Sequence, residues 1–128
     1  MTDEQLHELA DRFLAAWTSQ EVDRVLEIYS PELVYVDPNT RGAVEGRDGM
    51  RRYLNKLFAA WTMTWTLREA YPDGSGDNVA VLWHATFQRA EGGPLVEADG
   101  MDLVVVRDGL ILRNEVYFDR TVLSGVAA

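Results

Sequence analysis

The fold is decided by residues 95–119, which read LVEADGMDLVVVRDGLILRNEVYFD. Asp108-Gly109 stands in the middle, and this dipeptide favours the positive φ angles that a tight two-residue turn requires. Aliphatic and aromatic residues dominate both sides of the turn, which is typical of strands. The stretch therefore predicts a hairpin of two antiparallel strands, 95–107 and 110–119.

The rest of the chain supplies three more strands and three helices. Apolar residues at spacings of three and four predict helices in the first half, and alternation predicts strands in the second. The predicted elements are helix 3–17 with a Thr2/Gln5 capping box, a short helix from Ser19 to Ser30-Pro31, strand 33–37, helix 47–61, and strands 63–70 and 79–89. This order predicts an α+β domain, with three helices packed on a curved, mainly antiparallel sheet around a cone-shaped cavity. Residues 1–128 are expected to form a single domain with a frayed tail at 121–128.

Composition excludes several functions. The 128 residues carry 12 basic and 21 acidic side chains, a net charge of −9, and no cysteine. Such a charge repels phosphate, so neither nucleic acid nor an anionic membrane is an expected partner. Cysteine-ligated metal sites are excluded, and His7 and His84 are too far apart in sequence to suggest a zinc motif. We expect a cytoplasmic protein that acts on a small molecule or on another protein, without metal or other cofactor.

Two aspartates lie in otherwise apolar strands. Asp37 shares a strand face with Leu33 and Tyr35, although Asp-Pro is also a common turn in which the carboxylate caps its own backbone. Asp102 shares a strand face with Val104. Strand interiors disfavour aspartate, because burying an unpaired charge is costly. An edge position or a salt bridge to an arginine would also explain Asp102.

Two further polar residues form a second candidate set. His84 alternates with Leu82 and Thr86, which favours a hydrogen-bonded histidine in the core. Asp119 ends the last predicted strand, where a cap or an ion pair with Arg120 is the simpler interpretation. Apolar pockets with a few polar groups hold small ligands. The residues expected to line such a pocket are Phe13, Trp17, Tyr35, Tyr53, Trp61 and Tyr117.

These features resemble the nuclear-transport-factor-2-like superfamily and its SnoaL-like branch of polyketide cyclases. The resemblance rests on residues 29–38, 46–50, 104–111 and 116–119, and it extends over roughly residues 6–123. This fold hosts isomerases, cyclases, hydrolases, dehydratases and binding proteins, so the resemblance implies the fold more strongly than the function.

The mechanistic resemblance is to ketosteroid isomerase. That family places a general-base aspartate just before a proline, where Asp37 stands, and a protonated aspartate on a central strand, where Asp102 stands. The family's oxyanion tyrosine on the first helix corresponds to Phe13, which has no hydroxyl; Tyr35, Tyr53 or Tyr117 would have to supply a donor. Asp119 is similar in position to an aspartate of SnoaL-like cyclases.

Three functions follow from these residues. The leading hypothesis is proton transfer alpha to the carbonyl of a cyclic or polycyclic ketone, with Asp37 as base and Asp102 as proton donor. The alternatives are a module that binds an apolar ligand or dimerises without catalysis, and a hydrolase or dehydratase that uses Asp119 with His84. The resemblance also implies a homodimer that pairs through the open face of the sheet.

Overall fold

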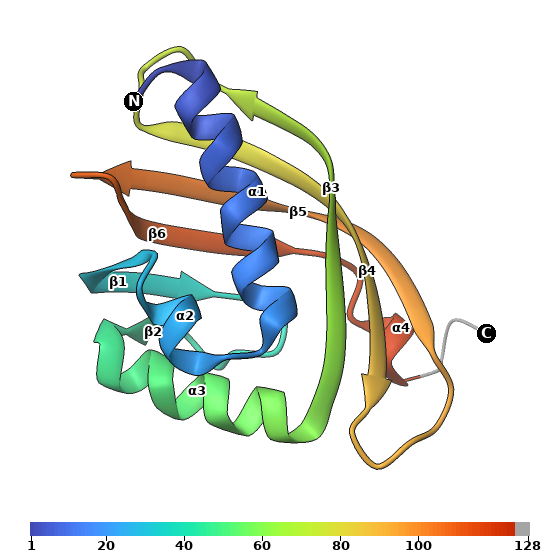
Figure 1. Cartoon of the computed structure of the whole chain (residues 1–128). Helices are drawn as coiled ribbons and strands as arrows, with labels where there is room; N and C mark the ends of the chain where they lie inside the picture. The colour runs from blue at the N-terminus through green and yellow to red at the C-terminus, as the bar shows by residue number, and fades with distance from the viewer. Residues whose placement is uncertain (125–128) are drawn as a thin grey trace.

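One curved sheet forms a layer, and helices α1 and α3 cover one of its faces (Figure 1). The computed structural model describes residues 1–124. Its elements, in chain order, are α1 (Asp3–Ser19), α2 (Val22–Leu26), β1 (Tyr29–Val36), β2 (Val44–Glu45), α3 (Gly46–Ala60), β3 (Trp61–Pro72), β4 (Asn78–Arg89), β5 (Val96–Arg107), β6 (Leu110–Tyr117) and α4 (Thr121–Ser124). The predicted α+β architecture is confirmed. No helix in this part of the chain is long and apolar enough to span a membrane.

The sheet has the strand order β2-β1-β6-β5-β4-β3. All neighbouring pairs are antiparallel except β1 and β6, which run parallel. The predicted hairpin joins β5 to β6, with Arg107 opposite Leu110 and φ angles of 55° at Asp108 and 76° at Gly109. Positive φ at both residues is the geometry of the tight turn that Asp-Gly favours.

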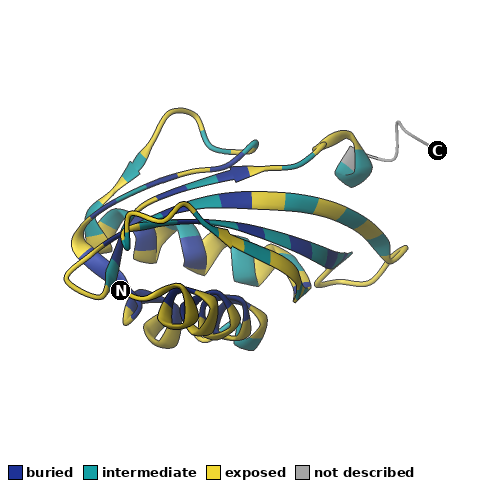
Figure 2. Ribbon diagram, turned by 90° about the horizontal axis from the view of Figure 1, so that it is seen from above, coloured by how far each residue is buried: buried dark blue, intermediate teal, exposed yellow. Residues whose placement is uncertain are grey.

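Helix α1 begins with the predicted capping box. The Gln5 amide donates to Thr2 Oγ1 at 3.1 Å, and the Thr2 amide donates to Gln5 Oε1 at 2.9 Å. Its apolar side packs against the sheet and is buried, and it includes Leu6, Leu9 and Phe13. Figure 2 shows that the buried residues of the strands alternate with less buried ones, as the two-residue period of a strand requires.

Gly100 permits the packing of the largest core side chain. It stands opposite Trp83 in the β4–β5 pair, and the Trp83 side chain is fully buried. A Cβ atom at Gly100 would lie 2.5 Å from Trp83 Cη2 and 2.7 Å from the Tyr117 carbonyl oxygen. The indole therefore crosses β5 at the one position of the strand that has no side chain.

Strand β1 begins earlier than the sequence predicts. We expected a helix to end at Ser30-Pro31, but Tyr29 already pairs with Ile111 of β6. The register shifts between Tyr29 and Val34, and such an irregularity accommodates Pro31, which has no amide hydrogen to donate. Burial of the Tyr29 ring, which is 0% exposed, favours the strand over the local helical pattern.

Two short elements also differ from the prediction. The structure adds the two-residue strand β2 and a single helical turn, α4, at positions for which the sequence predicts no such element. The predicted frayed tail covers 121–128, yet residues 121–124 form this turn. Residues 125–128 lie outside the described residues.

Candidate functional site

Asp37 follows the last residue of β1 and accepts four hydrogen bonds. Its Oδ1 accepts from the backbone amides of Asn39 at 2.7 Å and Thr40 at 3.0 Å, which is the self-capping turn expected for Asp-Pro. Its Oδ2 accepts from the hydroxyls of Tyr35, at 2.7 Å, and Tyr53. The turn therefore fixes one oxygen, while the other faces two tyrosines from β1 and α3.

Both tyrosines remain donors at any ordinary pH. Burial raises the pKa of the Tyr35 hydroxyl well above its usual value, and the nearby Asp37 charge raises it further. The same two causes raise the pKa of Tyr53. Two neutral phenols thus point at one carboxylate oxygen, and the Asp37 side chain is only 8% exposed.

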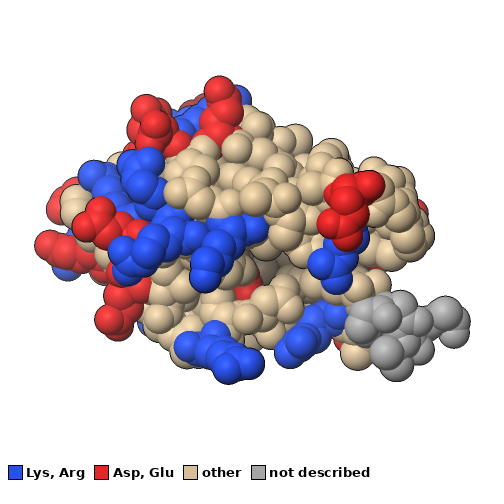
Figure 3. Space-filling model, turned by 90° about the horizontal axis from the view of Figure 1, so that it is seen from below, with Lys and Arg blue, Asp and Glu red and all other residues tan. Residues whose placement is uncertain are grey.

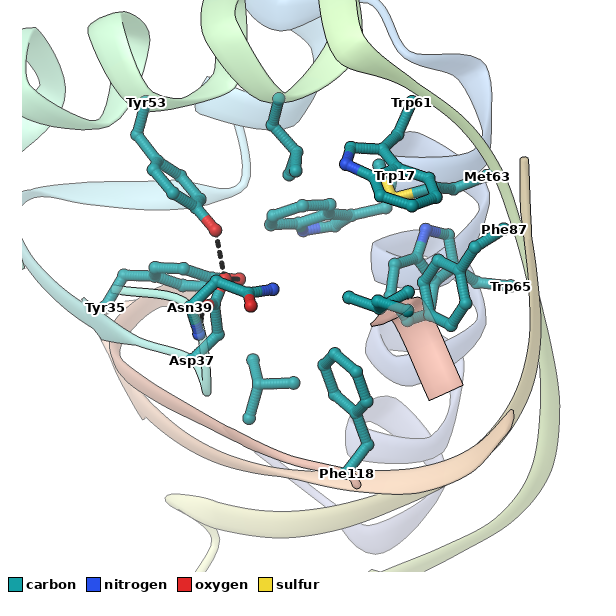
Figure 4. Close-up of a pocket in the computed structure, with 13 residues that line it drawn as sticks. Trp17, Tyr35, Asp37, Asn39, Tyr53, Trp61, Met63, Trp65, Phe87 and Phe118 are labelled. Atoms are coloured by element: carbon teal, nitrogen blue, oxygen red, sulfur yellow. Dashed lines mark hydrogen bonds between the residues drawn. The ribbon is translucent and has the colours of Figure 1, made fainter. Parts of the chain in front are cut away.

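These groups stand in the wall of an aromatic pocket, which we call the Asp37 hollow (Figure 4). It encloses an empty volume of about 390 Å³, counted out to its opening into solvent. Trp17 stacks on Tyr35 with ring centroids 5.7 Å apart. The described residues that line the hollow are Trp17, Tyr35, Asp37, Asn39, Tyr53, Leu57, Trp61, Met63, Trp65, Phe87, Val116, Phe118 and Leu123.

Asp102 lies deeper, at the end of a buried hydrogen-bond chain. Trp83 Nε1 donates to its Oδ1 at 2.8 Å, and Asn114 Nδ2 donates to its Oδ2 at 3.0 Å. Asn114 Oδ1 accepts from the Tyr29 hydroxyl at 2.7 Å, and that hydroxyl accepts from Trp17 Nε1 at 3.2 Å. The chain connects Asp102 to Trp17, which stands in the wall of the Asp37 hollow.

The Asp102 carboxyl holds its proton to a higher pH than an ordinary aspartate does. Burial raises its pKa from 3.8 to about 7, although the hydrogen bonds from Asn114 and Trp83 act in the opposite direction. Asp102 lines a second hollow of about 240 Å³ together with Phe13. This Asp102 hollow shares Trp17, Tyr35, Trp65 and Val116 with the Asp37 hollow, so the two hollows adjoin at these four side chains.

One residue expected in the pocket lies outside it. The Tyr117 side chain is 55% exposed and its hydroxyl donates to Glu115 at 3.4 Å, so the expectation that it lines the cavity is corrected. The cause is a bulge in the β5–β6 pair: Val105 pairs with Arg113 and Val106 with Ile111, which leaves Leu112 as an extra residue. The extra residue reverses which side chains of β6 point inward.

His84 and Asp119 do not form a site. His84 faces the outer side of the sheet, where Nδ1 lies 2.7 Å from Asp99 Oδ1 and Nε2 lies 3.0 Å from Glu97 Oε1. Its neighbours Trp83 and Ala85 point to the inner face of β4. Because side chains alternate along a strand, His84 points outward, and the prediction that it lies in the core is wrong. Asp119 Oδ1 accepts from Thr121 at the start of α4, which agrees with the simpler interpretation of a cap.

The sequence analysis missed three polar residues around the pocket. Asn114 and Tyr29 are fully buried and orient Asp102 and Trp17. Trp65 lines both hollows, and its buried Nε1–H has no hydrogen-bond partner among the described residues. Asn114 could have been found by the argument applied to Asp102, because a polar side chain among the apolar residues of a strand needs an explanation.

No group of three or more His, Asp or Glu side chains within residues 1–124 is arranged to hold a metal ion. The titratable groups brought near the pocket are instead Asp37, Asp102 and three tyrosines. Such a set can accept, donate and relay protons, which is the chemistry available to this site.

Comparison with known proteins identifies the family. The sequence matches the SnoaL-like domain family over residues 10–114, so the chain belongs to this family and to the NTF2-like superfamily that contains it. A search of curated proteins finds no significant match.

Solved structures agree on the fold. A putative isomerase from Bacillus subtilis has 17% identity and a TM-score of 0.86, with 99% of this chain and 96% of that chain covered. The epoxide hydrolase/cyclase-like enzyme SalBIII, which takes part in pyran ring formation in salinomycin, has 24% identity and a TM-score of 0.80, with 94% and 96% covered. A computationally designed 17-OHP binder has 17% identity and a TM-score of 0.77, with 89% and 92% covered. At such identities the similarity establishes the fold alone.

Proposed function

We propose that this SnoaL-like protein is an isomerase or cyclase that works without a cofactor and transfers a proton alpha to the carbonyl of a cyclic or polycyclic apolar ketone. The observation that carries the proposal is the position of Asp37, the one carboxylate among the described residues that line the aromatic Asp37 hollow. A base beside an apolar wall can reach a C–H bond of a bound ring.

In the proposed reaction Asp37 Oδ2 removes the proton. Its Oδ1 stays fixed by the turn amides, so the carboxylate keeps its orientation while a substrate displaces a tyrosine hydroxyl from Oδ2. The electron pair of the broken C–H bond moves into the carbonyl and forms an enolate. In a β,γ-unsaturated ketone the enolate is a dienolate, and Asp37 returns the proton to its γ carbon as the double bond migrates. In a ring closure the enolate carbon attacks a second carbonyl of the same molecule, and the alkoxide that forms takes the proton from Asp37.

Asp102 has the complementary role in this proposal. Its carboxyl is neutral below about pH 7 and can share its proton with the developing enolate oxygen. Trp83 and Asn114 each donate to one of its oxygens, which restrains the orientation of the carboxyl group. A fixed donor in an apolar site stabilises the enolate more than water does.

The test requires no knowledge of the product. A panel of indanones, tetralones and decalones is incubated with the protein in D₂O, and deuterium uptake alpha to the carbonyl is followed by NMR. We expect at least one ketone to exchange faster with the protein, and Asp37→Asn to slow this exchange by about 10²–10⁴-fold. Asp119→Asn, an exposed carboxylate outside the pocket, is the matched control and should not change the rate. Equal rates for Asp37→Asn and the native protein would contradict the role of Asp37.

A second candidate is a domain that binds an apolar ligand without converting it. It is favoured by the four hydrogen bonds that Asp37 already accepts, because a carboxylate surrounded by donors can be purely structural. The designed 17-OHP binder of the same fold supports this alternative. Saturable ketone binding without any deuterium uptake would favour it over the first proposal.

The proposal also includes a cytoplasmic homodimer. The outer face of the sheet carries exposed apolar side chains, and Met101 and Tyr117 lie opposite each other in the β5–β6 pair, 36% and 55% exposed. Apolar patches of this kind mark association surfaces. Light scattering at micromolar concentration should give the mass of a dimer, and the mass of a monomer would contradict the pairing.

A further inference from the structure

The Asp37 hollow opens into a wider depression, which we call the vestibule. Its empty volume is about 1170 Å³, counted into solvent, and it shares Asn39, Tyr53, Leu57, Trp61 and Leu123 with the Asp37 hollow. A molecule that leaves the Asp37 hollow past these shared residues enters the vestibule. Among the described residues, no aspartate or glutamate lines it.

Three cations do line it: Lys56 from α3, Arg89 at the end of β4 and Arg120 between β6 and α4. Figure 3 shows basic side chains on this face around a hollow. The three residues are distant in sequence, so the fold and not a local run of charge brings them to one depression. In a chain of net charge −9, a cationic lining without an acidic residue opposes the overall charge.

Within the part of the chain that the structure describes, the three cations also lack acidic partners. Five other arginines, Arg24, Arg51, Arg68, Arg107 and Arg113, are within 4.0 Å of a carboxylate. Lys56, Arg89 and Arg120 have no such ion pair with any residue in 1–124. Their charge is therefore available to a bound molecule.

Arg89 is held in position at the boundary between the two spaces. Its guanidinium carbon lies 4.3 Å from the centroid of the Trp61 ring, which is a cation–π contact. Trp61 lines both the vestibule and the Asp37 hollow. A guanidinium fixed on this wall is ready to bind a carboxylate without first losing the freedom of an unrestrained side chain.

We propose that the vestibule binds a carboxylate group of the substrate, whose apolar ring system enters the Asp37 hollow. The inference deepens the proposed function and rests on it: the substrate class becomes an apolar cyclic ketone that carries a carboxylate. A single negative charge fits best, because the net charge of −9 opposes a multiply charged anion more strongly.

Charge also sets the orientation of this substrate. The Asp37 carboxylate repels a second carboxylate from the hollow, whereas Lys56, Arg89 and Arg120 attract it outside. The carboxylate therefore stays at the mouth and the uncharged rings go inward. A ketone carbonyl on these rings then lies inside the hollow that Asp37 and Tyr53 line.

The test compares two ligands of the same ring size by calorimetry: naphthalene-2-carboxylate and the neutral ketone 2-acetylnaphthalene. At about 20 mM NaCl we expect the carboxylate to bind about tenfold more tightly, and this preference to shrink at about 300 mM NaCl. Lys56→Gln and Arg89→Gln should each weaken carboxylate binding by about three- to tenfold and change ketone binding by less than about twofold. Arg12→Gln removes the same charge from an exposed position of α1 and is the matched control.

Two results would overturn the vestibule. One is equal affinity for the two ligands, or no carboxylate binding up to millimolar concentration. The other is an equal effect of Arg12→Gln and Arg89→Gln on carboxylate binding. That result would show that the preference for the carboxylate depends on the net charge of the protein and not on the vestibule. Asp37→Asn separates this inference from the proposed function, since it should slow deuterium exchange by about 10²–10⁴-fold while the carboxylate preference stays the same or increases. Deuterium exchange without a preference for the carboxylate would support proton transfer and contradict carboxylate binding in the vestibule.

Discussion

The buried carboxyl of Asp102 should make the stability of the protein fall as pH rises. In the unfolded chain the group ionises near its ordinary pKa of 3.8, whereas in the folded protein burial raises the pKa to about 7. Between these values the folded state binds more protons than the unfolded state, so folding loses free energy with each step in pH. The loss is complete above the folded pKa.

The size of the effect follows from the two pKa values. The difference between 3.8 and about 7 is about three pKa units, and one unit corresponds to about 1.4 kcal/mol, so the full loss is about 4 kcal/mol. Asp102→Asn removes this titration and keeps the shape of the side chain. Its amide turns one acceptor into a donor that faces Trp83 or Asn114, at a pH-independent cost of about 1–3 kcal/mol.

Urea unfolding followed by tryptophan fluorescence, at one fixed protein concentration, measures both the pH-dependent loss and the pH-independent cost. At about pH 4 the variant should be less stable than the native protein by about 1–3 kcal/mol. By about pH 8 the difference should have moved by about 4 kcal/mol in favour of the variant. Asp119→Asn is the control, because hydrogen bonds from Thr121 lower the pKa of that exposed carboxyl and leave it ionised throughout this range. Parallel curves for Asp102→Asn and the native protein would refute the reasoning.

Two further substitutions test the packing behind the site. Gly100→Ala places a Cβ 2.5 Å from Trp83 Cη2, so the indole or the strand must move, and we expect a loss of about 1–3 kcal/mol in the free energy of unfolding. An unchanged urea midpoint would show that the indole can be displaced without cost. Tyr29→Phe leaves Asn114 Oδ1 and Trp17 Nε1 without their partner, and it should cost about 1–3 kcal/mol by the same assay. A variant as stable as the native protein would mean that the buried chain does not stabilise the fold.

Short sequence patterns correctly predicted the features of the fold that depend on only a few neighbouring residues. The Thr2/Gln5 capping box and the Asp108-Gly109 turn each act within a few residues, and both are present. The two-residue period also placed Asp102 on the inner face with Val104, because the strand is regular between these positions. Pattern arguments succeed where the backbone is regular over the distance to which they are applied.

The same period failed where the sheet is irregular. The extra residue Leu112 in β6 turns Tyr117 outward and Val116 and Asn114 inward, and nothing in the sequence of one strand marks that bulge. Tyr29 joins the sheet through a parallel pairing with β6, a contact between residues more than eighty positions apart. The hydrogen-bond chain from Trp17 to Asp102 depends on both irregularities and could therefore not be predicted.

The pH dependence of proton exchange tests the central claim most directly. The claim is that Asp37 removes a proton from a bound ketone while neutral Asp102 stabilises the enolate. The measurement is the rate of deuterium uptake by the most reactive ketone of the panel, from about pH 5.5 to about pH 8.5 after correction for the uncatalysed reaction. We predict a rate that falls as pH rises through about 7, where Asp102 loses its proton, and that no longer falls there in Asp102→Asn. A rate that stays flat or increases across this range in the native protein would contradict the account.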